Sequence, residues 1–347
     1  MFEVMRLNKK LNDDNKDTLY IITGAAGHLA GTIIRYLENA NCRVRGLILP
    51  SEKAGDTGNT TYYKGDVTKE ESLNEIFSGS EDYETIVIHA AAMISISDEA
   101  AGMMYDINVN GTKNIIRLCE KHKVKRLVYV GSVDALPEKP GMAVITEVDS
   151  FPAEKVEGAY AKTKAEASQA VLEASRSGLD AVIVMPSGII GPYDDGRNHM
   201  VQLVRSYING KLPAGITGGY DFVDVRDVAK GCIAAAHYGE KGECYILSNR
   251  YCSVKHLLEY MRIAADGRKK FCVSAGFVKL LVPMFEWVGK LTKKRPLVTR
   301  FSLNLLKRPA IFSHDKATMQ LKYSPRDLKD TIADTVNWIK YRRCELN

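Results

Sequence analysis

The chain has 347 residues, of which 45% are hydrophobic and 26% charged, which suits a soluble globular protein with a substantial core. Its formal net charge is +6, but 48 basic residues are interspersed with 42 acidic ones and no nucleic-acid-binding module is recognisable, so we expect no nucleic-acid partner. The seven cysteines are odd in number and include no C-x-x-C pair. This pattern argues against a disulfide framework or a metal site and indicates reduced thiols in a cytoplasmic protein.

Two segments could be mistaken for targeting or membrane signals. Residues 1–17 are rich in charge and contain no continuous apolar stretch, so they predict an N-terminal tail rather than a secretion signal. Residues 277–291, FVKLLVPMFEWVGKL, are interrupted by two lysines, a glutamate and a proline. This stretch is too short and too charged to span a bilayer, so we expect no integral membrane span. A buried amphipathic helix is the favoured interpretation, and a peripheral membrane contact is the alternative.

Short apolar runs alternate with longer segments of helical period from residue 18 onward. The runs LYIIT, TIVIHAAA, RLVYVGS and DAVIVMPS are nearly continuous in apolar residues, as in strands that are buried on both faces. The pattern predicts an α/β fold, a doubly wound parallel sheet of the Rossmann type over residues 18–190. We expect residues 220–248 to fold back onto it, and 191–219 with 249–347 to form a smaller C-terminal substrate-binding lobe.

The sequence TGAAGHLA follows the first predicted strand and opens a helix. Gly24 and Gly27 lie where a tight turn must bring the backbone close to a pyrophosphate, and Ala30 takes the third small position. Unpaired N–H groups and the helix dipole favour an anion at this place. The turn therefore predicts a dinucleotide site, whereas a glycine turn that only packs is the less favoured interpretation.

The end of the second predicted strand bears on the choice of dinucleotide. An acidic residue there would bind the ribose 2′-hydroxyl of NAD, and the expected place at residues 48–49 contains none. We therefore expect NADP(H) to be preferred, with NAD(H) as the alternative. Arg45, Ser51 and Lys53 are the candidate contacts to a 2′-phosphate.

The chain contains two tyrosines that precede a lysine by four residues. Tyr160 begins a predicted amphipathic helix, so Lys164 lies one turn further on the same face. Upstream, the predicted strand LVYVGS ends at Ser132, at the sheet edge where the dinucleotide is expected. Tyr251 and Lys255 have no such upstream partner and are interpreted as surface residues. The sequence thus predicts a proton-transfer site formed by Ser132, Tyr160 and Lys164.

A phenol needs help to exchange a proton at neutral pH. Lowering its pKa by about three units takes roughly 4 kcal/mol. One ammonium about 4 Å away supplies about that much at an effective dielectric near 20. We therefore expect Lys164 to lower the pKa of Tyr160, while Ser132 holds the substrate oxygen.

Seven motifs occur in a characteristic order, TGAAGHLA, VIHAAA, NVNGTKN, VYVGS, YAKTKAE, PSGIIGP and DFVDVRDVA. The chain resembles the extended short-chain dehydrogenase/reductases, within the NAD-dependent epimerase/dehydratase family, from about residue 18 to about residue 340. The resemblance implies a Rossmann domain with a catalytic Ser132, Tyr160 and Lys164. It also implies a homodimer formed through residues 102–121 and 160–177. The residues that it places along the cofactor are Gly24, Ala26, Gly27, His28, Leu29, Asp66, Val67, Ala90, Ala91, Ala92, Lys164, Pro186, Ser187 and Gly188.

Four further polar residues fall in these motifs. For Asn108, which the resemblance places near the active-site end of its helix, we favour a positioning role. Asp224 and Asp227 are interpreted as capping or positioning residues in the same way. His89 is expected to be a packed residue at a strand end rather than a catalytic base.

One departure from the family pattern narrows the activity. Sugar-nucleotide epimerases and dehydratases usually have an arginine, which grips the diphosphate, where this chain has Tyr220. The chain looks more like dihydroflavonol reductases and 3-beta-hydroxysteroid dehydrogenases. This resemblance implies an enzyme that interconverts a ketone or aldehyde and an alcohol on a fairly apolar small molecule, in a pocket shaped by residues 198–212 and 251–310. The alternatives are a sugar-nucleotide epimerase or dehydratase with tightly bound NAD and a non-catalytic dinucleotide sensor.

Overall fold

The structure is a computed structural model, and it describes residues 17–54, 58–94, 100–137, 144–194, 198–278 and 311–345. The N-terminal tail before residue 17 and most of the predicted amphipathic segment 277–291 lie outside these ranges. None of the helices in the described ranges is long and apolar enough to cross a membrane.

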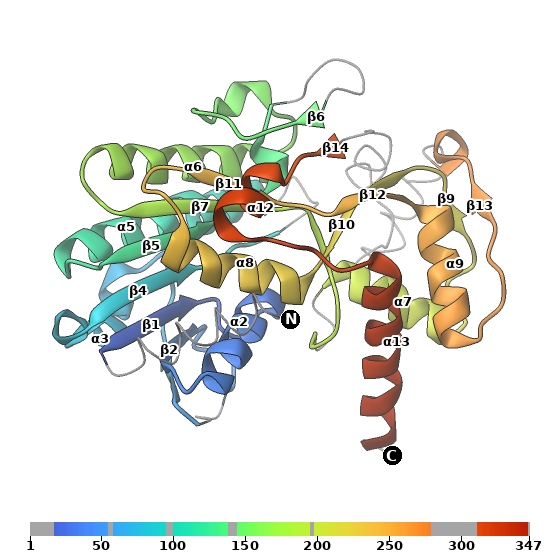
Figure 1. The fold of residues 1–347 in the computed structure, drawn as a ribbon, viewed down its shortest axis with the longest axis horizontal. Coiled ribbons are helices and arrows are strands. Elements are labelled where there is room, and N and C mark those ends of the chain that lie inside the picture. Colours follow the sequence, from blue (N-terminus) through green and yellow to red (C-terminus); the bar gives the residue numbers. More distant parts are fainter. Residues whose placement is uncertain are drawn as a thin grey trace.

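A seven-stranded sheet forms the centre of the molecule, and all of its strand pairs are parallel (Figure 1). The strand order is β11-β7-β5-β4-β1-β2-β3, so the chain builds outward from β1 in one direction and then returns to build in the other. The predicted doubly wound parallel fold is confirmed. The strands are β1 (Thr18–Thr23), β2 (Arg43–Ile48), β3 (Thr60–Lys64), β4 (Glu84–His89), β5 (Arg126–Val130), β7 (Ala181–Pro186) and β11 (Cys244–Leu247).

Alternate residues of the central strands feed two separate cores. In β1, Leu19 and Ile21 join the core on one face, whereas Tyr20 and Ile22 join the core on the other. This is the two-residue period of a strand that is covered on both sides. The first face is covered by α3 (Asn74–Phe77), α5 (Gly111–Lys121) and α6 (Ala159–Arg176), and the second by α2 (His28–Asn39), α8 (Val225–Tyr238) and α12 (Asp315–Leu321).

The remaining elements form small sheets and a second group of helices. The small sheets are β12-β10-β8, β13-β9 and β14-β6. Their strands are β6 (Val144–Ile145), β8 (Gly188–Ile190), β9 (Gly215–Ile216), β10 (Gly219–Asp224), β12 (Arg250–Ser253), β13 (Cys272–Val273) and β14 (Ile311–Phe312). The helices α7 (His199–Ile208), α9 (Val254–Ala265) and α13 (Leu328–Glu345) pack together (Figure 1). Short 3-10 segments are η1 (Glu70–Leu73), η2 (Ser80–Asp82), η5 (Val133–Ala135) and η6 (Ala153–Lys155).

The segment predicted to fold back, residues 220–248, does so only in part. β11 joins the main sheet beside β7, and α8 covers it, but β10 pairs with β8 and β12 in a separate sheet. In addition, α12 packs against α8 and β11 although it falls within the range 249–347 predicted for the lobe. The domain boundaries themselves stay a prediction.

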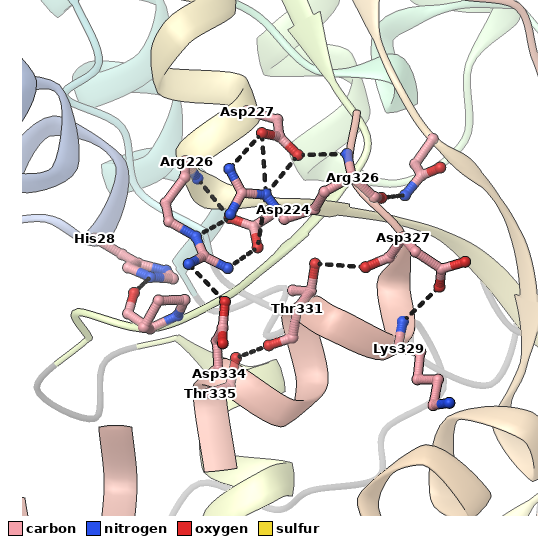
Figure 2. A network of polar contacts seen from close by, with 12 residues as sticks. His28, Asp224, Arg226, Asp227, Arg326, Asp327, Lys329, Thr331, Asp334 and Thr335 are labelled. Atoms are coloured by element: carbon pink, nitrogen blue, oxygen red, sulfur yellow. Dashed lines mark hydrogen bonds and ion pairs between the residues drawn. The ribbon is translucent and has the colours of Figure 1, made fainter. Parts of the chain in front are cut away.

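A network of charged side chains fastens α13 to the start of α8 (Figure 2). Asp224 is fully buried, caps α8 by accepting from the Arg226 N–H, and receives two more hydrogen bonds from the Arg226 guanidinium. Arg226 also pairs with Asp334 on α13, and Arg326 pairs with Asp227. Burial by itself raises the pKa of Asp224, but the hydrogen bonds from Arg226 and the charge of Arg326 bring it below its ordinary value. Asp224 and Asp227 are thus positioning residues, as expected.

This network predicts a large stability difference between two arginine variants. Arg226→Met would leave the Asp224 carboxylate buried with one partner fewer, so we expect the free energy of unfolding to fall by about 3 kcal/mol. Arg250→Met is the control, because its pair with Asp327 is half-exposed and should cost less than about 1 kcal/mol. Urea denaturation at neutral pH measures both values. Equal losses in the two variants would contradict this role for the network.

Candidate active site

The glycine-rich turn connects the end of β1 to the start of α2. Gly24 has a φ of +69°, and a Cβ atom on it would lie 2.9 Å from the Ala91 Cα atom. The turn and the loop after β4 therefore approach each other at a distance that only glycine allows. Helix α2 has no side-chain hydrogen bond at its N-cap, Gly27, and no acidic residue in its first turn. Its free N–H groups and the helix dipole suit a phosphate group.

The side chains of the helix start face away from this turn. His28 hydrogen-bonds the Pro192 carbonyl oxygen through Nε2 at 2.7 Å, and its Nδ1 accepts from the Asn198 amide at 3.1 Å. Burial lowers its pKa. Leu29 is buried in the core beneath α2. The side chains of His28 and Leu29 therefore point away from the turn, and the His28 ring ties the turn to the loop that precedes α7.

The predicted walls of the dinucleotide site follow β3 and β4. Thr23 Oγ1 accepts hydrogen bonds from the N–H groups of Ala90 and Ala91, each at 3.1 Å, which fixes the loop that continues to Ala92. At the other end, Asp66 follows β3, and its carboxylate accepts from Thr68. The neighbouring Val67 is buried. The Gly65 N–H donates to the carbonyl oxygen of Ile48, so this loop lies beside the end of β2.

The end of β2 differs from the expectation. Glu52 folds back, and its carboxylate accepts a hydrogen bond from the Leu49 N–H at 2.9 Å. A carboxylate therefore does stand at this strand end, and it belongs to a residue three positions beyond the expected place at residues 48–49. Ser51 and Lys53 are exposed beside it.

Arg45 does not reach this strand end, which corrects its prediction as a phosphate contact. Its guanidinium donates to the carbonyl oxygens of Ile76 and Ser78 and lies over the Tyr63 ring. Arg45 lies in the middle of β2, opposite Ile21, so its side chain is used to cap the end of α3. An arginine could bind a 2′-phosphate, but Arg45 lies too far from the end of β2 to do so.

The structure brings Ser132 and Tyr160 together at the carboxyl end of β5. Ser132 follows β5 and caps η5, Tyr160 lies in the first turn of α6, and a hydrogen bond joins the two hydroxyl groups. Both side chains are buried, with 7% and 9% of their surface exposed. Gly158, with a φ of +93°, permits the sharp entry into α6. The other tyrosine-lysine pair is elsewhere, because Tyr251 is exposed on β12.

Lys164 is buried one turn beyond Tyr160. Its Nζ donates to the Val130 carbonyl oxygen at 2.7 Å and to the Tyr129 hydroxyl at 3.3 Å. Burial lowers its pKa to about 7. The pKa of Tyr160 is raised, first by burial and then by the charge of Asp134, and only the hydrogen bond from Ser132 lowers it.

These pKa shifts correct the expected effect of Lys164 on the phenol. Desolvation opposes the phenolate more strongly than the ammonium favours it, because the ammonium itself is out of water and turned toward β5. At neutral pH Tyr160 therefore keeps its proton. A protonated phenol beside a serine hydroxyl is suited to donate a proton to an oxygen held between them.

A buried chain of polar side chains continues behind Lys164. The Tyr129 hydroxyl is hydrogen-bonded to Thr112, which contacts His89 Nε2, and His89 Nδ1 contacts Thr23 Oγ1 at 2.7 Å. Burial lowers the pKa of His89 to about 3, so the ring is neutral. The interpretation of His89 as a packed strand-end residue is confirmed.

Asn108 lies in an irregular helix. The segment is divided into α4 (Ala101–Tyr105), a π-helical turn η4 (Asp106–Asn110) and α5. The Asn108 side chain exchanges hydrogen bonds with the backbone of Met93 and donates to Thr163 Oγ1. It thereby holds the loop after β4 against α6, which is the positioning role expected for it. Such π-helical turns are frequent near functional sites.

The segment after β7 closes the site from the other side. Pro186 ends β7, Gly188 begins β8, and the Ser187 hydroxyl between them donates to the carboxylate of Asp221. Asp221 is buried, and burial raises its pKa. Among the described residues, no cluster of metal-binding side chains is present.

Sequence reasoning missed one pair of residues at this site. The Tyr220 hydroxyl, on β10, donates to Asp134 Oδ1 at 2.8 Å. Asp134 lies in η5, and its N–H donates to Ser132 Oγ at 3.2 Å. The signal in the sequence was an acidic residue two positions after the predicted catalytic serine, although nothing there linked it to Tyr220.

A family model, several relatives and solved structures match the chain. The family model described as NAD-dependent epimerase/dehydratase matches residues 20–248. The chain is 27% identical to a Synechocystis protein provisionally named dihydroflavonol 4-reductase, over 92% of this chain and 94% of that protein. It is 28% identical to the decarboxylating sterol-4-alpha-carboxylate 3-dehydrogenase of Schizosaccharomyces pombe, over 92% and 97%. The crystal structure of gox2253 matches with a TM-score of 0.79 at 28% identity, over 93% and 98%. Solved epimerase structures at 19–20% identity share the fold.

The depressed pKa of Lys164 predicts a pH dependence of stability. The folded state releases this proton above about pH 7, whereas the unfolded chain holds it up to the ordinary value of 10.5. The unfolded state binds more protons in this interval, so the free energy of unfolding should rise from about pH 7 to pH 10. Lys164→Met should remove this part of the rise. Urea titrations of both proteins at several pH values measure the difference, and parallel pH curves would rule out a buried amine of low pKa.

Proposed function

Because the chain belongs to the NAD-dependent epimerase/dehydratase family and is an NAD(P)-dependent oxidoreductase, we propose that it interconverts a ketone and a secondary alcohol on a fairly apolar small molecule. The observation that carries this proposal is the protonated Tyr160 phenol, hydrogen-bonded to Ser132 at the carboxyl edge of the sheet. Ligands of open parallel sheets bind at this edge, so a carbonyl oxygen can be placed between the two hydroxyl groups.

The residues that are present fit a dinucleotide. The turn from Gly24 to Gly27 would hold the pyrophosphate, Ala90 and Ala91 would line its path, and Ser187 would lie beside the nicotinamide. When bound, the cofactor supplies or accepts a hydride at the substrate carbon. The roles of these residues rest on the match between their places at the sheet edge and the order of the motifs in the chain.

In the reducing direction the chain contributes a proton and its route. Ser132 would donate a hydrogen bond to the carbonyl oxygen, and Tyr160 would transfer its proton to that oxygen as the carbon gains a hydride. The substrate thereby gains one hydride and one proton. Lys164, with a pKa near neutrality, is suited to return a proton to the phenolate that remains. In the oxidising direction the same proton leaves the alcohol through Tyr160.

The relatives support the apolar substrate class. Their names are those of a dihydroflavonol reductase and a sterol dehydrogenase, and both name polycyclic substrates. The lobe expected to shape the pocket includes α7 and the strand β12. Residues 279–310 of the expected pocket lie outside the described residues.

We also propose that the chain forms a homodimer through the face made by α4, α5 and α6. These helices pack on one another beside the main sheet. Met103 and Tyr105 on α4 are large apolar residues with 61% and 38% of their surface exposed. A second copy would cover them, and sedimentation at micromolar concentration measures whether it does.

Tyr160→Phe tests the proposed proton donor. Removing the hydroxyl should lower kcat for ketone reduction by at least about a hundredfold, because proton donation is lost while the dinucleotide contacts remain. The dissociation constant for NAD(H), measured by fluorescence, should change little. Tyr251→Phe is a matched control, since it also lies four residues before a lysine but is exposed. If Tyr160→Phe turned over ketone at the rate of Tyr251→Phe, the proposed function would be wrong.

The end of β2 leads us to reverse the preference between dinucleotides and to propose NAD(H). The Glu52 carboxylate lies at the end of β2, where it would accept a hydrogen bond from a ribose 2′-hydroxyl and would repel a 2′-phosphate. Of the three residues expected to contact such a phosphate, Arg45 is committed to α3, whereas Ser51 and Lys53 are exposed at this strand end.

Glu52→Gln tests this preference. The unmodified protein should show a higher kcat/KM with NADH than with NADPH. In the variant, the ratio of the two kcat/KM values should shift toward NADPH by about tenfold, because the carboxylate that repels the 2′-phosphate is removed. Glu84→Gln, at the opposite end of the strands in β4, should leave the ratio unchanged. A preference for NADPH in the unmodified protein would restore the original expectation.

A sugar-nucleotide epimerase or dehydratase is the second candidate, because the family includes both activities. Such an enzyme would retain its dinucleotide through purification and convert a nucleotide sugar without added cofactor. Tyr220 argues against it, because it stands where such enzymes usually have the arginine that grips the diphosphate, and its hydroxyl is hydrogen-bonded to Asp134. Product chromatography with UDP- and dTDP-sugars separates this activity from ketone reduction.

A further inference from the structure

We propose that Thr112 is a positioning residue for Tyr160, and that it acts through a buried chain of hydrogen bonds. The inference rests on the proposed oxidoreductase function and deepens it by naming what holds the proton donor in place. The chain of hydrogen bonds begins at the loop after β4, which would line the dinucleotide, and it ends at the first turn of α6.

The first half of the chain determines the protonation of His89. Thr23 Oγ1 accepts hydrogen bonds from the N–H groups of Ala90 and Ala91. A threonine hydroxyl has two lone pairs and one proton, so the Thr23 proton is left for His89 Nδ1 at 2.7 Å. His89 therefore accepts through Nδ1 and carries its own proton on Nε2. A proton on Nδ1 would point at an oxygen whose lone pairs are already used.

The second half leads from His89 to the backbone of Tyr160. His89 Nε2 donates to Thr112 Oγ1 at 3.1 Å, and the Thr112 hydroxyl donates to the Asn108 carbonyl oxygen at 2.6 Å. The Asn108 side-chain amide donates to Thr163 Oγ1 at 3.0 Å. The Thr163 hydroxyl then donates to the Tyr160 carbonyl oxygen at 2.9 Å. Each hydroxyl gives its proton to one partner and accepts from another, so the direction of every bond is determined.

The chain joins five elements of the fold and is closed to water. Its linking residues come from β1, β4, η4, α5 and α6, and every side-chain nitrogen and oxygen among them has a partner. None of these side chains has more than 4% of its surface exposed, namely Thr23, His89, Asn108, Thr112 and Thr163. A lost partner in such a place is not easily replaced by water, so its neighbours must move.

A second threonine shows what is particular to Thr112. Threonines in helices often donate to the carbonyl group four residues earlier. Thr335 on α13 does so with the Thr331 carbonyl oxygen at 2.6 Å, the same length as the bond from Thr112 to Asn108. Both threonines are buried, with 0% and 1% of their surface exposed. The bond received from His89 distinguishes Thr112, and it connects α5 with the loop after β4.

The two ends of the chain are the parts whose relative position matters for the reaction. The Tyr160 phenol must lie within hydrogen-bonding distance of the substrate oxygen while the substrate carbon faces the dinucleotide. A displacement of about 1 Å in such an arrangement can lower the rate about a hundredfold. An interruption at Thr112 should therefore lower kcat, whereas the turn at Gly24 and the affinity for the dinucleotide should be retained.

The test replaces the Thr112 hydroxyl and follows reduction of a neutral 3-ketosteroid by NADH through absorbance. Thr112→Val keeps the shape of the side chain, and kcat should fall by at least about tenfold while KM for NADH stays within about threefold. Thr112→Ser retains the hydroxyl and should keep kcat within about threefold of the unmodified protein. Thr335→Val is the matched control, because it removes an equally buried bond of the same kind and should leave kcat unchanged.

The tautomer of His89 is a second readout that needs no substrate. In protein labelled with nitrogen-15 at its seven histidines, His89→Gln identifies the His89 signals in the NMR spectrum. Between about pH 6 and pH 8 the ring should be protonated on Nε2 and unprotonated on Nδ1. In Thr112→Val the Nε2 proton should exchange faster with solvent. A ring protonated on Nδ1 would overturn the chain and the role of Thr112 with it.

The outcomes separate this inference from the proposed function. Equal kcat values for Thr112→Val and Thr335→Val would overturn the positioning role and leave the oxidoreductase function standing. If Thr112→Val melts early, Thr163→Val and Thr163→Ser repeat the comparison at the far end of the chain, and equal kcat values there would also overturn the role. Failure of the unmodified protein to reduce either the 3-ketosteroid or a dihydroflavonol with added dinucleotide would overturn the proposed function and this inference together.

Discussion

Burial of both faces of the parallel sheet is the constraint on which the rest of the molecule depends. Alternate residues of each central strand enter separate cores, so neither face can hold exposed polar chemistry. Polar side chains must therefore gather where the strands end. Thr23, His89 and Ser132 all lie at this edge, although they come from three different strands or their following loops. The position of the site follows from the burial of both faces of the sheet, which leaves the strand ends as the place for polar side chains.

The same burial determines the protonation states at the site. Lys164 extends from α6 to a strand carbonyl, and the loss of water around it brings its pKa to about 7. Tyr160 retains its proton for the same reason, because a phenolate would be desolvated as well. Tyr160 can therefore donate a proton at neutral pH without first having to accept one. This order suits reduction of a carbonyl group, and it arises from packing rather than from a single neighbouring charge.

Prediction from the sequence succeeded where a pattern was local. The strand-turn-helix at Gly24 and the tyrosine-lysine pair on α6 depend on residues only a few positions apart, and the alternation of strands and helices was regular enough to indicate the parallel sheet. Reasoning failed where a turn or a distant segment sets the direction of a side chain. Glu52 reaches the end of β2 by folding back after a proline, and Arg45 is captured by the end of α3. Neither event leaves a periodic trace in the sequence.

The sequence by itself determined the class of fold, the strand-turn-helix at Gly24 and the placement of Tyr160 and Lys164 on one helix, because each follows from hydrophobic period or from spacing within one element. Only the tertiary structure decided the environment of those residues. Asp134 and Tyr220 are 86 positions apart and meet because a separate small sheet places β10 opposite the end of β5. The charge and the burial of each site residue depend on residues that are distant in the sequence but close in space. The sequence alone does not show which residues these are.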